Sequence, residues 1–137
     1  MAIALYQPDI PQNFGAIIRL SACFGAPVHI VEPCGFVLDE RRIRRVAMDY
    51  IDHATLIRHA NFEAFLRDRP PGRMVLFSTR GTERFDRFRF ASDDTLLFGQ
   101  ESAGMPDPVR ARCDAEVVIP LQKNARSLNV AQTVAIA

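Results

Sequence analysis

Residues 119–137 read IPLQKNARSLNVAQTVAIA, and this stretch decides how the chain is expected to fold. An apolar run that starts at Val117 ends at Pro120, a polar loop follows, and from Ser127 small and apolar residues continue to the last residue. Chain termini are usually polar and frayed. This segment instead has the pattern of a strand, a loop and a helix with Ser127 as its N-cap. We therefore expect a C-terminal helix that is buried against the rest of the protein.

The preceding chain alternates between short apolar runs and segments with helical periodicity. The expected strands are residues 2–7, 28–31, 53–59 (short), 74–78, 95–98 and 115–120. The expected helices are 14–25 with Gly25 as C-cap, 39–51 with Asp39 as N-cap, 61–69 with Asn61 as N-cap, and 107–113. Residues 80–90 are expected to form a loop that can hold a short helix. This alternation is typical of an α/β fold with a mostly parallel sheet and helices on both faces.

Composition and length indicate one globular domain over residues 1–137, because 48% of the 137 residues are apolar and 24% are charged. No apolar run approaches the roughly 18 residues that a membrane span needs. The N-terminus lacks the basic region of a signal peptide, so a cytoplasmic protein is expected. The three cysteines are scattered, and neither they nor the three histidines have a metal-ligand spacing. We therefore expect reduced thiols and no metal.

Three loops that follow strands are rich in Gly, Pro, Asn, Ser and Arg. They read QPDIPQNFGAIIR (7–19), FGQESAGMP (98–106) and IPLQKNARSLN (119–129). In open α/β sheets, ligands bind at the carboxyl ends of the strands, so these loops form the candidate site. The chain has no GxGxxG after its first strand and no GxxxxGK[ST]. An ordinary dinucleotide-binding fold is therefore poorly supported.

Taken together, the three loops resemble the three motifs of the SpoU-type methyltransferases of the SPOUT superfamily. The matching residues are Asn13, Gly15 and Arg19, then Gly99, Glu101, Gly104 and Pro106, then Ile119, Pro120, Ser127, Leu128 and Asn129. IALYQPDIPQN, HIVEPCGF and RRVAMDY also resemble the small single-domain branch, which acts on the wobble nucleotide of tRNA. The resemblance implies a deep C-terminal trefoil knot and S-adenosyl-L-methionine as cofactor. Family members continue past the position of Ala137, so the C-terminal helix is expected to be incomplete.

The resemblance also implies roles for individual side chains in direct methyl transfer to a ribose 2′-hydroxyl. The residues implied to be catalytic are Arg19, Asn13, Glu101, Ser127 and Asn129. Those implied to hold the cofactor are Phe77, Gly99, Glu101, Gly104, Ile119, Ser127 and Leu128. Arg19 is expected to position groups and stabilise charge, because an arginine pKa above about 12 makes it a poor base.

Taken singly, these side chains have simpler interpretations. Asn13, Ser127 and Asn129 can be helix caps, and Glu101 can be a solvated loop carboxylate. Arg19 can be a surface arginine whose stem packs along apolar neighbours. Phe77 and Ile119 can be plain core residues.

The implied substrate is position 34 in the anticodon stem-loop of leucine-type tRNAs. Candidate phosphate contacts are Arg41, Arg42, Arg44 and Arg45 in the RRIRR run, and Lys123 and Arg126 in the last loop. Most charge runs are only solvated faces, and this interpretation stays open for RRIRR. Lys123 and Arg126 can likewise belong to a solvated loop without RNA contacts. Because one small domain offers little surface to a stem-loop, a homodimer is expected. In the family the first and last helices pack together in the dimer.

Two other classes of function remain open from the residues. The first is a Rossmann-like nucleotide-binding oxidoreductase, which a bound nicotinamide would reveal. The second is a non-catalytic RNA-binding module, which would keep the RRIRR run but would not need Asn13, Arg19 and Ser127 together. Binding of RNA without methyl transfer would select that second class.

Overall fold

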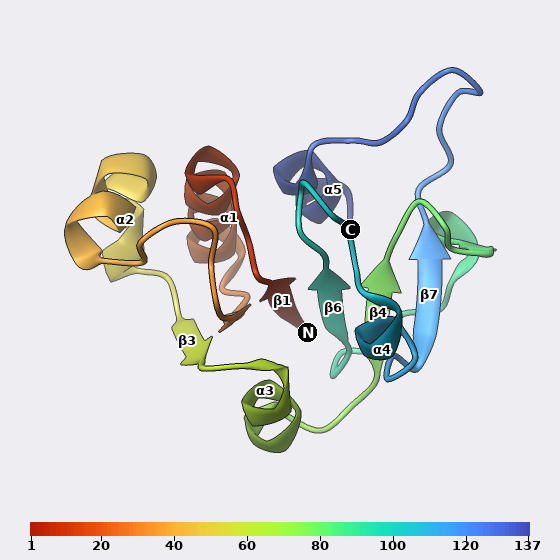
Figure 1. Cartoon of the computed structure of the whole chain (residues 1–137), viewed down its shortest axis with the longest axis horizontal. Coiled ribbons are helices and arrows are strands. Elements are labelled where there is room, and N and C mark those ends of the chain that lie inside the picture. The colour runs from red at the N-terminus through yellow and green to blue at the C-terminus, as the bar shows by residue number, and fades with distance from the viewer.

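The computed structural model describes residues 1–137, except for the side chain of Glu40. One seven-stranded sheet has the order β3-β2-β1-β6-β4-β7-β5, and each neighbouring pair is parallel (Figure 1). The strands are β1 (Ala2–Tyr6), β2 (Val28–Val31), β3 (Leu56–His59), β4 (Met74–Phe77), β5 (Glu83–Arg84), β6 (Thr95–Phe98) and β7 (Ala115–Val118). The parallel sheet predicted from the alternating pattern is confirmed.

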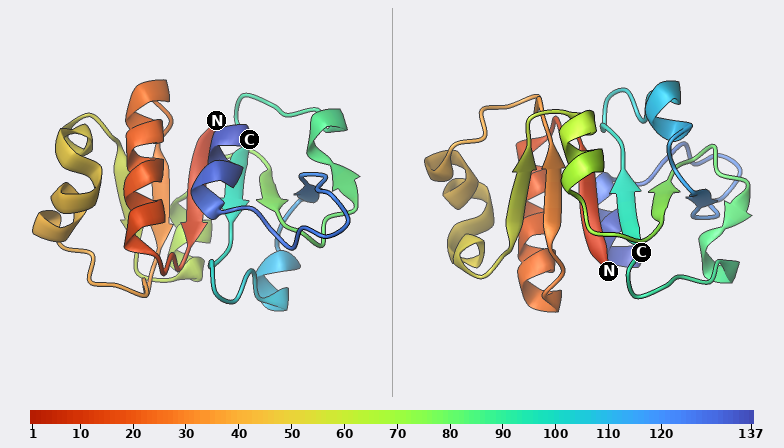
Figure 2. Two further views of the ribbon diagram at one scale, coloured as in Figure 1. Left: turned by 90° about the horizontal axis from the view of Figure 1, so that it is seen from above. Right: turned by 90° about the horizontal axis from the view of Figure 1, so that it is seen from below.

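Helices cover both faces of this sheet, as Figures 1 and 2 show. They are α1 (Pro11–Phe24), α2 (Glu40–Ala47), α3 (Phe62–Asp68), α4 (Asp107–Arg110) and α5 (Val130–Ile136), with short 3₁₀ helices at Met48–Asp52 and Phe85–Arg87. Residues of α1, α2 and α5 share one hydrophobic core with the sheet, and residues of α3 and α4 share the other. Among the described helices, none combines the length and the apolar character that crossing a membrane requires.

The central strands are largely apolar because helices cover them on both sides, and the exceptions His29 in β2 and Thr95 in β6 are buried as well. All four residues of β2, of β4 and of β6 are buried. β5 differs from them, since its two residues are exposed and it pairs only with β7 at the edge of the sheet. β5 was not predicted from the sequence, because a strand of two exposed residues leaves no apolar run.

Helix α1 begins earlier than predicted. Pro11 occupies its first turn, where a missing N–H costs nothing. Asn13 therefore lies inside the helix, and its interpretation as the N-cap is wrong. The predicted C-cap is confirmed, because Gly25 has φ +66° in the left-handed region that favours glycine. Gly15 lets α1 approach α2 closely, since an added Cβ would lie 2.7 Å from Cβ of Val46.

Side-chain caps fix the starts of three other helices. The predicted caps Asp39 and Asn61 are confirmed, and each side chain accepts a backbone N–H bond of 2.8 Å. The predicted cap Ser127 is wrong for α5. Asn129 caps this helix, accepting from the backbone N–H of Ala131 at 2.8 Å. Ser127 and Leu128 of the third motif therefore lie in the loop before α5 instead of in its first turn.

The C-terminal helix packs against the rest of the protein, as the sequence predicts, and it lies on the sheet face that also carries α1 (Figure 2). Its Val134 is only 6% exposed, although Ile136 at its end is 46% exposed. The loop before α5 arcs away from β7 and returns to this face (Figure 1). The threading of this segment as a trefoil knot stays a prediction.

Candidate active site

A cavity of about 540 Å³ lies at the carboxyl ends of β4, β6 and β7. Its walls come from all three loops that the sequence analysis singled out, together with the segment after β4. Its lining includes Asn13, Phe77, Ser78, Arg80, Phe98, Gly99, Glu101, Gly104, Arg110, Ile119, Ser127, Leu128 and Asn129. The structure therefore brings together segments that are far apart along the chain, at the edge of the sheet where ligands bind in this class of fold.

A chain of side-chain hydrogen bonds joins the three loops at this cavity. Nδ2 of Asn13 donates to Oε1 of Glu101 at 3.1 Å, across 88 residues of sequence. Nδ2 of Asn129 donates to Oδ1 of Asn13 at 2.7 Å, across 116 residues. Oδ1 of Asn129 meanwhile caps α5. Because both ends of each amide have partners, the orientations of Asn13 and Asn129 are fixed.

Asp9 connects the first loop (7–19) to the second loop (98–106) by hydrogen bonds. The backbone N–H of Asp9 donates to Oε2 of Glu101 at 3.1 Å, and the backbone N–H of Glu101 donates back to Oδ1 of Asp9 at 3.2 Å. Oδ2 of Asp9 accepts from the backbone N–H of Ser102 at 3.2 Å and from its hydroxyl. Asp9 was not predicted from the sequence, because an Asp between two prolines has the ordinary pattern of a turn.

The pKa values of the carboxyl groups of Glu101 and Asp9 are shifted in opposite directions. Burial, followed by the contact with Asp9, raises the pKa of Glu101. The contact with the Glu101 side chain, together with hydrogen bonds from Ser102, lowers the pKa of Asp9. Asp9 therefore carries the charge of the pair at lower pH. A carboxylate with a raised pKa is also a better proton acceptor once it is ionised.

Glycines let the second loop close tightly beside the cavity. Gln100 and Gly104 exchange two backbone hydrogen bonds of 3.0 and 2.9 Å, and Gly104 has φ +71°. A Cβ on Gly99 would lie 2.7 Å from the carbonyl carbon of Gly104. Backbone atoms therefore form this wall, and a larger residue at position 99 would push the loop apart.

Apolar side chains form most of the remaining surface. The rings of Phe77 and Phe98 stack with centroids 5.2 Å apart, and Ile119 and Leu128 line the cavity with them. Within residues 119–128, all of them described, the structure gives one backbone hydrogen bond, from Ala125 N–H to Gln122 C=O at 2.9 Å. Flat apolar walls with available backbone donors and acceptors fit a nucleoside, and so they fit the adenosine part of S-adenosylmethionine.

The cavity collects most of the side chains proposed from the sequence. All seven candidates for cofactor binding line it, and so do the catalytic candidates Asn13, Glu101, Ser127 and Asn129. Arg19 is not among the residues described as lining it. Its exposed side chain lies over the ring of Tyr50, with the guanidinium carbon 5.2 Å from the ring centroid. The roles predicted for these residues stay predictions.

The candidate RNA contacts fall in two places. Arg41, Arg42, Arg44 and Arg45 lie on α2, next to the β3 edge of the sheet and away from the cavity of the same chain (Figure 1). Arg42 pairs with Asp39 at 3.3 Å, and Arg44 pairs with Asp52 at 2.7 Å. Lys123 and Arg126 are exposed in the loop that borders the cavity.

Comparisons with known proteins agree with this geometry. Two tRNA (cytidine(34)-2′-O)-methyltransferases, from Beijerinckia indica and Escherichia coli K12, are 49% and 38% identical to this chain. Each alignment covers 98% of this chain, and 85% and 87% of the relative.

Solved structures show the same fold. One, described as giving structural insights into the 2-OH methylation of C/U34 on tRNA, matches with a TM-score of 0.93 at 42% identity, over 98% of this chain and 89% of that one. The SpoU methyltransferase AviRb from Streptomyces viridochromogenes, in complex with the cofactor AdoMet, matches with a TM-score of 0.83 at 26% identity, over 99% and 56%. The model of the SpoU rRNA Methylase family matches residues 1–137, and the chain therefore belongs to the SpoU methylase family.

Proposed function

We propose that this protein is an S-adenosylmethionine-dependent methyltransferase that modifies the ribose 2′-hydroxyl of nucleotide 34 in tRNA. The observation that carries the proposal is the chain of hydrogen bonds from Asn129 through Asn13 to Glu101, at a cavity that fits a nucleoside. Two relatives that carry the name of this activity are 49% and 38% identical over nearly the whole chain. Leucine-type tRNAs are the proposed substrates.

The residues of the cavity divide into those that hold the cofactor and those that orient the ribose. S-adenosylmethionine supplies a methyl group on a positively charged sulfur. Phe77, Ile119 and Leu128 would enclose its base, and the backbone of Gly99 and Gly104 would border it. Positioning of two reacting groups can supply several kcal/mol of the barrier, about 7 or more in well-oriented cases.

The amide chain is suited to orient the 2′-hydroxyl. Asn13 and Asn129 are fixed by their mutual bond, so neither must reorganise when the ribose arrives. Glu101 is the only carboxylate among the described lining residues, which makes it the candidate to receive the hydroxyl proton. The pKa of Glu101 is raised, which favours this role because a carboxylate with a raised pKa accepts a proton more readily than an ordinary one.

We also propose a homodimer packed through α1 and α5, in the cytoplasm where mature tRNA is found. The outward stripe of α1 consists of Gln12, Ala16, Arg19 and Cys23, all exposed. Phe24 next to it is 77% exposed, and burial against a partner would remove this large apolar surface from water. Arg19 lies on the same stripe, so in such a dimer it would approach the cavity of the partner rather than its own.

Mixing two inactive variants tests this arrangement of Arg19. If Arg19 acts in the partner's cavity, Arg19→Ala and Asn129→Ala subunits mixed from the unfolded state will form dimers with one intact site. About a quarter of the wild-type activity is expected, because half of the dimers are mixed and each has one working site of two. No recovery on mixing would mean that Arg19 acts in the cavity of its own subunit, and an Arg19→Ala variant that is active by itself would place Arg19 outside the reaction.

Labelled S-adenosylmethionine tests the proposed function itself. The protein is incubated with the labelled cofactor and total tRNA, and the methylated nucleotide is mapped. We expect label on the 2′-oxygen of nucleotide 34. Label on a base, or on another position, would contradict the proposal. Binding of tRNA without transfer would indicate the non-catalytic RNA-binding module instead.

A further inference from the structure

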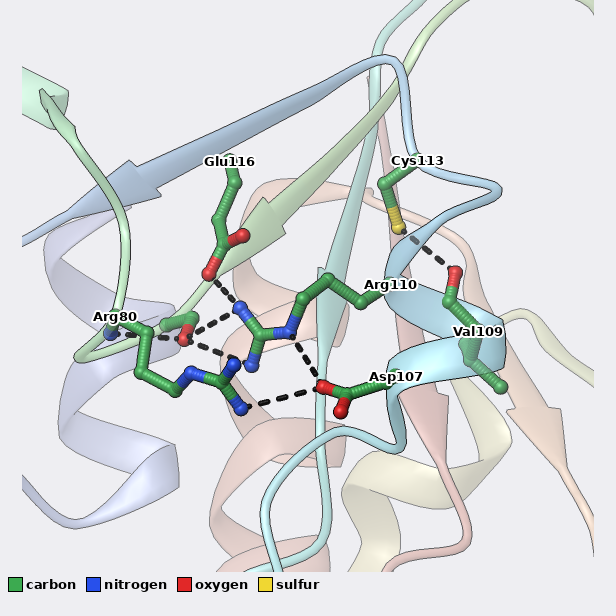
Figure 3. A network of polar contacts seen from close by, with 7 residues as sticks. Arg80, Asp107, Val109, Arg110, Cys113 and Glu116 are labelled. Carbon is green, nitrogen blue, oxygen red and sulfur yellow. Dashed lines mark hydrogen bonds and ion pairs between the residues drawn. The ribbon is translucent and has the colours of Figure 1, made fainter.

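A second polar wall of the cavity lies away from the amide chain, where the segment after β4 meets α4. Figure 3 shows its two guanidinium groups, those of Arg80 and Arg110. Both residues line the cavity, together with Ser78. The side chain of Arg110 is only 16% exposed, so it faces the interior of the site more than solvent. The proposed function has not yet given these side chains a role.

Two carboxylates hold these guanidinium groups in place. Arg110 forms an ion pair with Glu116 through Nη1. Oδ1 of Asp107 lies 3.2 Å from Nη1 of Arg80 and 3.6 Å from Nε of Arg110. Asp107 and Glu116 are not among the residues described as lining the cavity, whereas both arginines are. The acids therefore support the arginines, and the arginines face the cavity.

The arginines keep donors that their described partners do not use. A guanidinium carries five N–H donors. The hydrogen bond described for the Arg80 side chain goes to Asp107, and the buried Nε of Arg110 has no hydrogen-bond partner among the described atoms. Nη1 and Nη2 of Arg110 each lie 3.4 Å from Oγ of Ser78, a long contact. Two positioned guanidinium groups beside a hydroxyl are suited to an oxyanion, either a carboxylate or a phosphate.

We propose that Arg80 and Arg110 bind the α-carboxylate at the amino-acid end of S-adenosylmethionine. The inference rests on the proposed function, in which this cofactor enters the cavity. Its carboxylate is its only anionic group, and its base is assigned to the apolar wall. The amino-acid end is then the part of the ligand that matches two guanidinium groups. Arg80 and Arg110 thus select ligands that carry this end.

An RNA phosphate is a poorer match for this wall. Asp107 and Glu116 offset the charge of the two arginines, so the group as a whole offers little net attraction to a polyanion. Arg110 is also recessed, with a side chain 16% exposed, and a phosphodiester on the surface of a folded RNA would have to enter the cavity to reach it. A carboxylate that is part of the bound cofactor is already inside.

Two ligands that differ only in the amino-acid end give a direct test. S-adenosylhomocysteine carries that end, and 5′-deoxy-5′-methylthioadenosine lacks it. Binding of each is measured by calorimetry for the wild type, Arg80→Gln and Arg110→Gln. We expect each variant to bind S-adenosylhomocysteine about tenfold or more weakly, the usual scale for a lost hydrogen bond to a charged group. Binding of methylthioadenosine should change by less than about twofold.

Arg112→Gln is the matched control. Arg112 follows α4 closely, but it is exposed, and its ion pair with Glu63 at 3.9 Å lies outside the set of lining residues. This variant should bind both ligands like the wild type. The exposed side chain of Arg80 makes Arg80→Gln a safe variant for folding, so the test holds even if Arg110→Gln is unstable.

Three results would overturn the inference. Unchanged S-adenosylhomocysteine binding in Arg80→Gln and Arg110→Gln would show that the arginines do not contact the ligand. Equal weakening of both ligands would show that they only shape the cavity. Weaker tRNA binding with unchanged S-adenosylhomocysteine binding would assign them to a phosphate. If the wild type bound neither ligand, the proposed function itself would be wrong, whatever the arginines do.

Discussion

The sheet has two lateral sides, one formed by β1, β2 and β3 and the other by β4, β6 and β7. Both are parallel, but the space at their strand ends is filled in different ways. On the side of β1, β2 and β3, side chains fill the space between strands and helices. Phe14, Ile17 and Ile18 of α1 are at most 1% exposed, and Gly15 lets α2 approach α1 closely. On the side of β4, β6 and β7, loops close the strand ends by backbone and amide hydrogen bonds and leave a cavity of about 540 Å³.

The difference shows how one small domain supplies both a scaffold and a site. On the first side the buried contacts are mostly apolar and stabilise the fold, and α1 contributes Asn13 to the cavity from the end of this packing. On the second side, polar groups hold one another across 88 to 116 residues of sequence. Substitutions on the first side should therefore change stability, and substitutions on the second side should change activity.

A pair of asparagine substitutions should separate the two sides most clearly. Asn13→Ala removes the link between Glu101 and Asn129, so we expect methyl transfer to fall about 100-fold or more, as when one positioned donor is lost. Asn61→Ala removes the cap of α3 and should cost about 1 kcal/mol of unfolding free energy, with transfer intact. Single-turnover assays and urea unfolding of both variants measure the two effects. Activity loss in Asn61→Ala, or normal activity in Asn13→Ala, would break the division.

The scaffold was largely predictable from the sequence, because its signals are local. Apolar runs marked six of the seven strands, and the caps Asp39, Asn61 and Gly25 marked helix ends. The parallel arrangement followed from the alternation of strands and helices. The strand order did not follow, since it depends on which surfaces pack together.

The site was predictable only as a set of loops. Their motifs brought Asn13, Glu101, Ser127 and Asn129 to one cavity, but the partners of these residues are remote in sequence. Nothing local distinguishes Asp9 from an ordinary turn residue, and nothing local pairs Arg110 with Glu116 and Ser78. The cap of α5 was assigned to Ser127 because serine and asparagine are both good caps, and backbone geometry alone decides between them.

A buried histidine pair should make the scaffold side sensitive to acid. Nδ1 of His29 lies 2.9 Å from Nε2 of His59 between β2 and β3. Burial, followed by the charge of His59, lowers the pKa of His29 to about 4. Between pH 6.5 and about 4 the unfolded chain binds a proton that the folded chain does not, so stability falls as the pH falls through this window.

The expected loss between pH 7 and pH 5 is about 1–2 kcal/mol from this group. Urea unfolding at the two pH values measures it. His29→Leu should reduce the difference, whereas His53→Gln, which changes an exposed histidine, should keep it. An unchanged pH dependence in His29→Leu would remove the pair as its source.

The smallest effects are expected from exposed cations, and their positions sharpen the comparison further. Arg41 lies on α2 beside the scaffold side of its own chain, and Lys123 lies in the loop that borders the cavity. If both contact tRNA phosphates, Arg41→Gln and Lys123→Gln should each weaken binding about two- to threefold and lower its salt dependence slightly. Filter binding at several salt concentrations measures the affinity and its salt dependence, and Arg87→Gln, which changes an exposed arginine near β5, serves as the control.

Weaker binding only in Lys123→Gln would confine RNA contact to the side of the cavity, and the RRIRR run would then be a solvated face. Weaker tRNA binding in both variants would mean that tRNA contacts both sides of the sheet. Because α2 lies away from the cavity of its own chain, a second subunit would then have to bring α2 near that cavity.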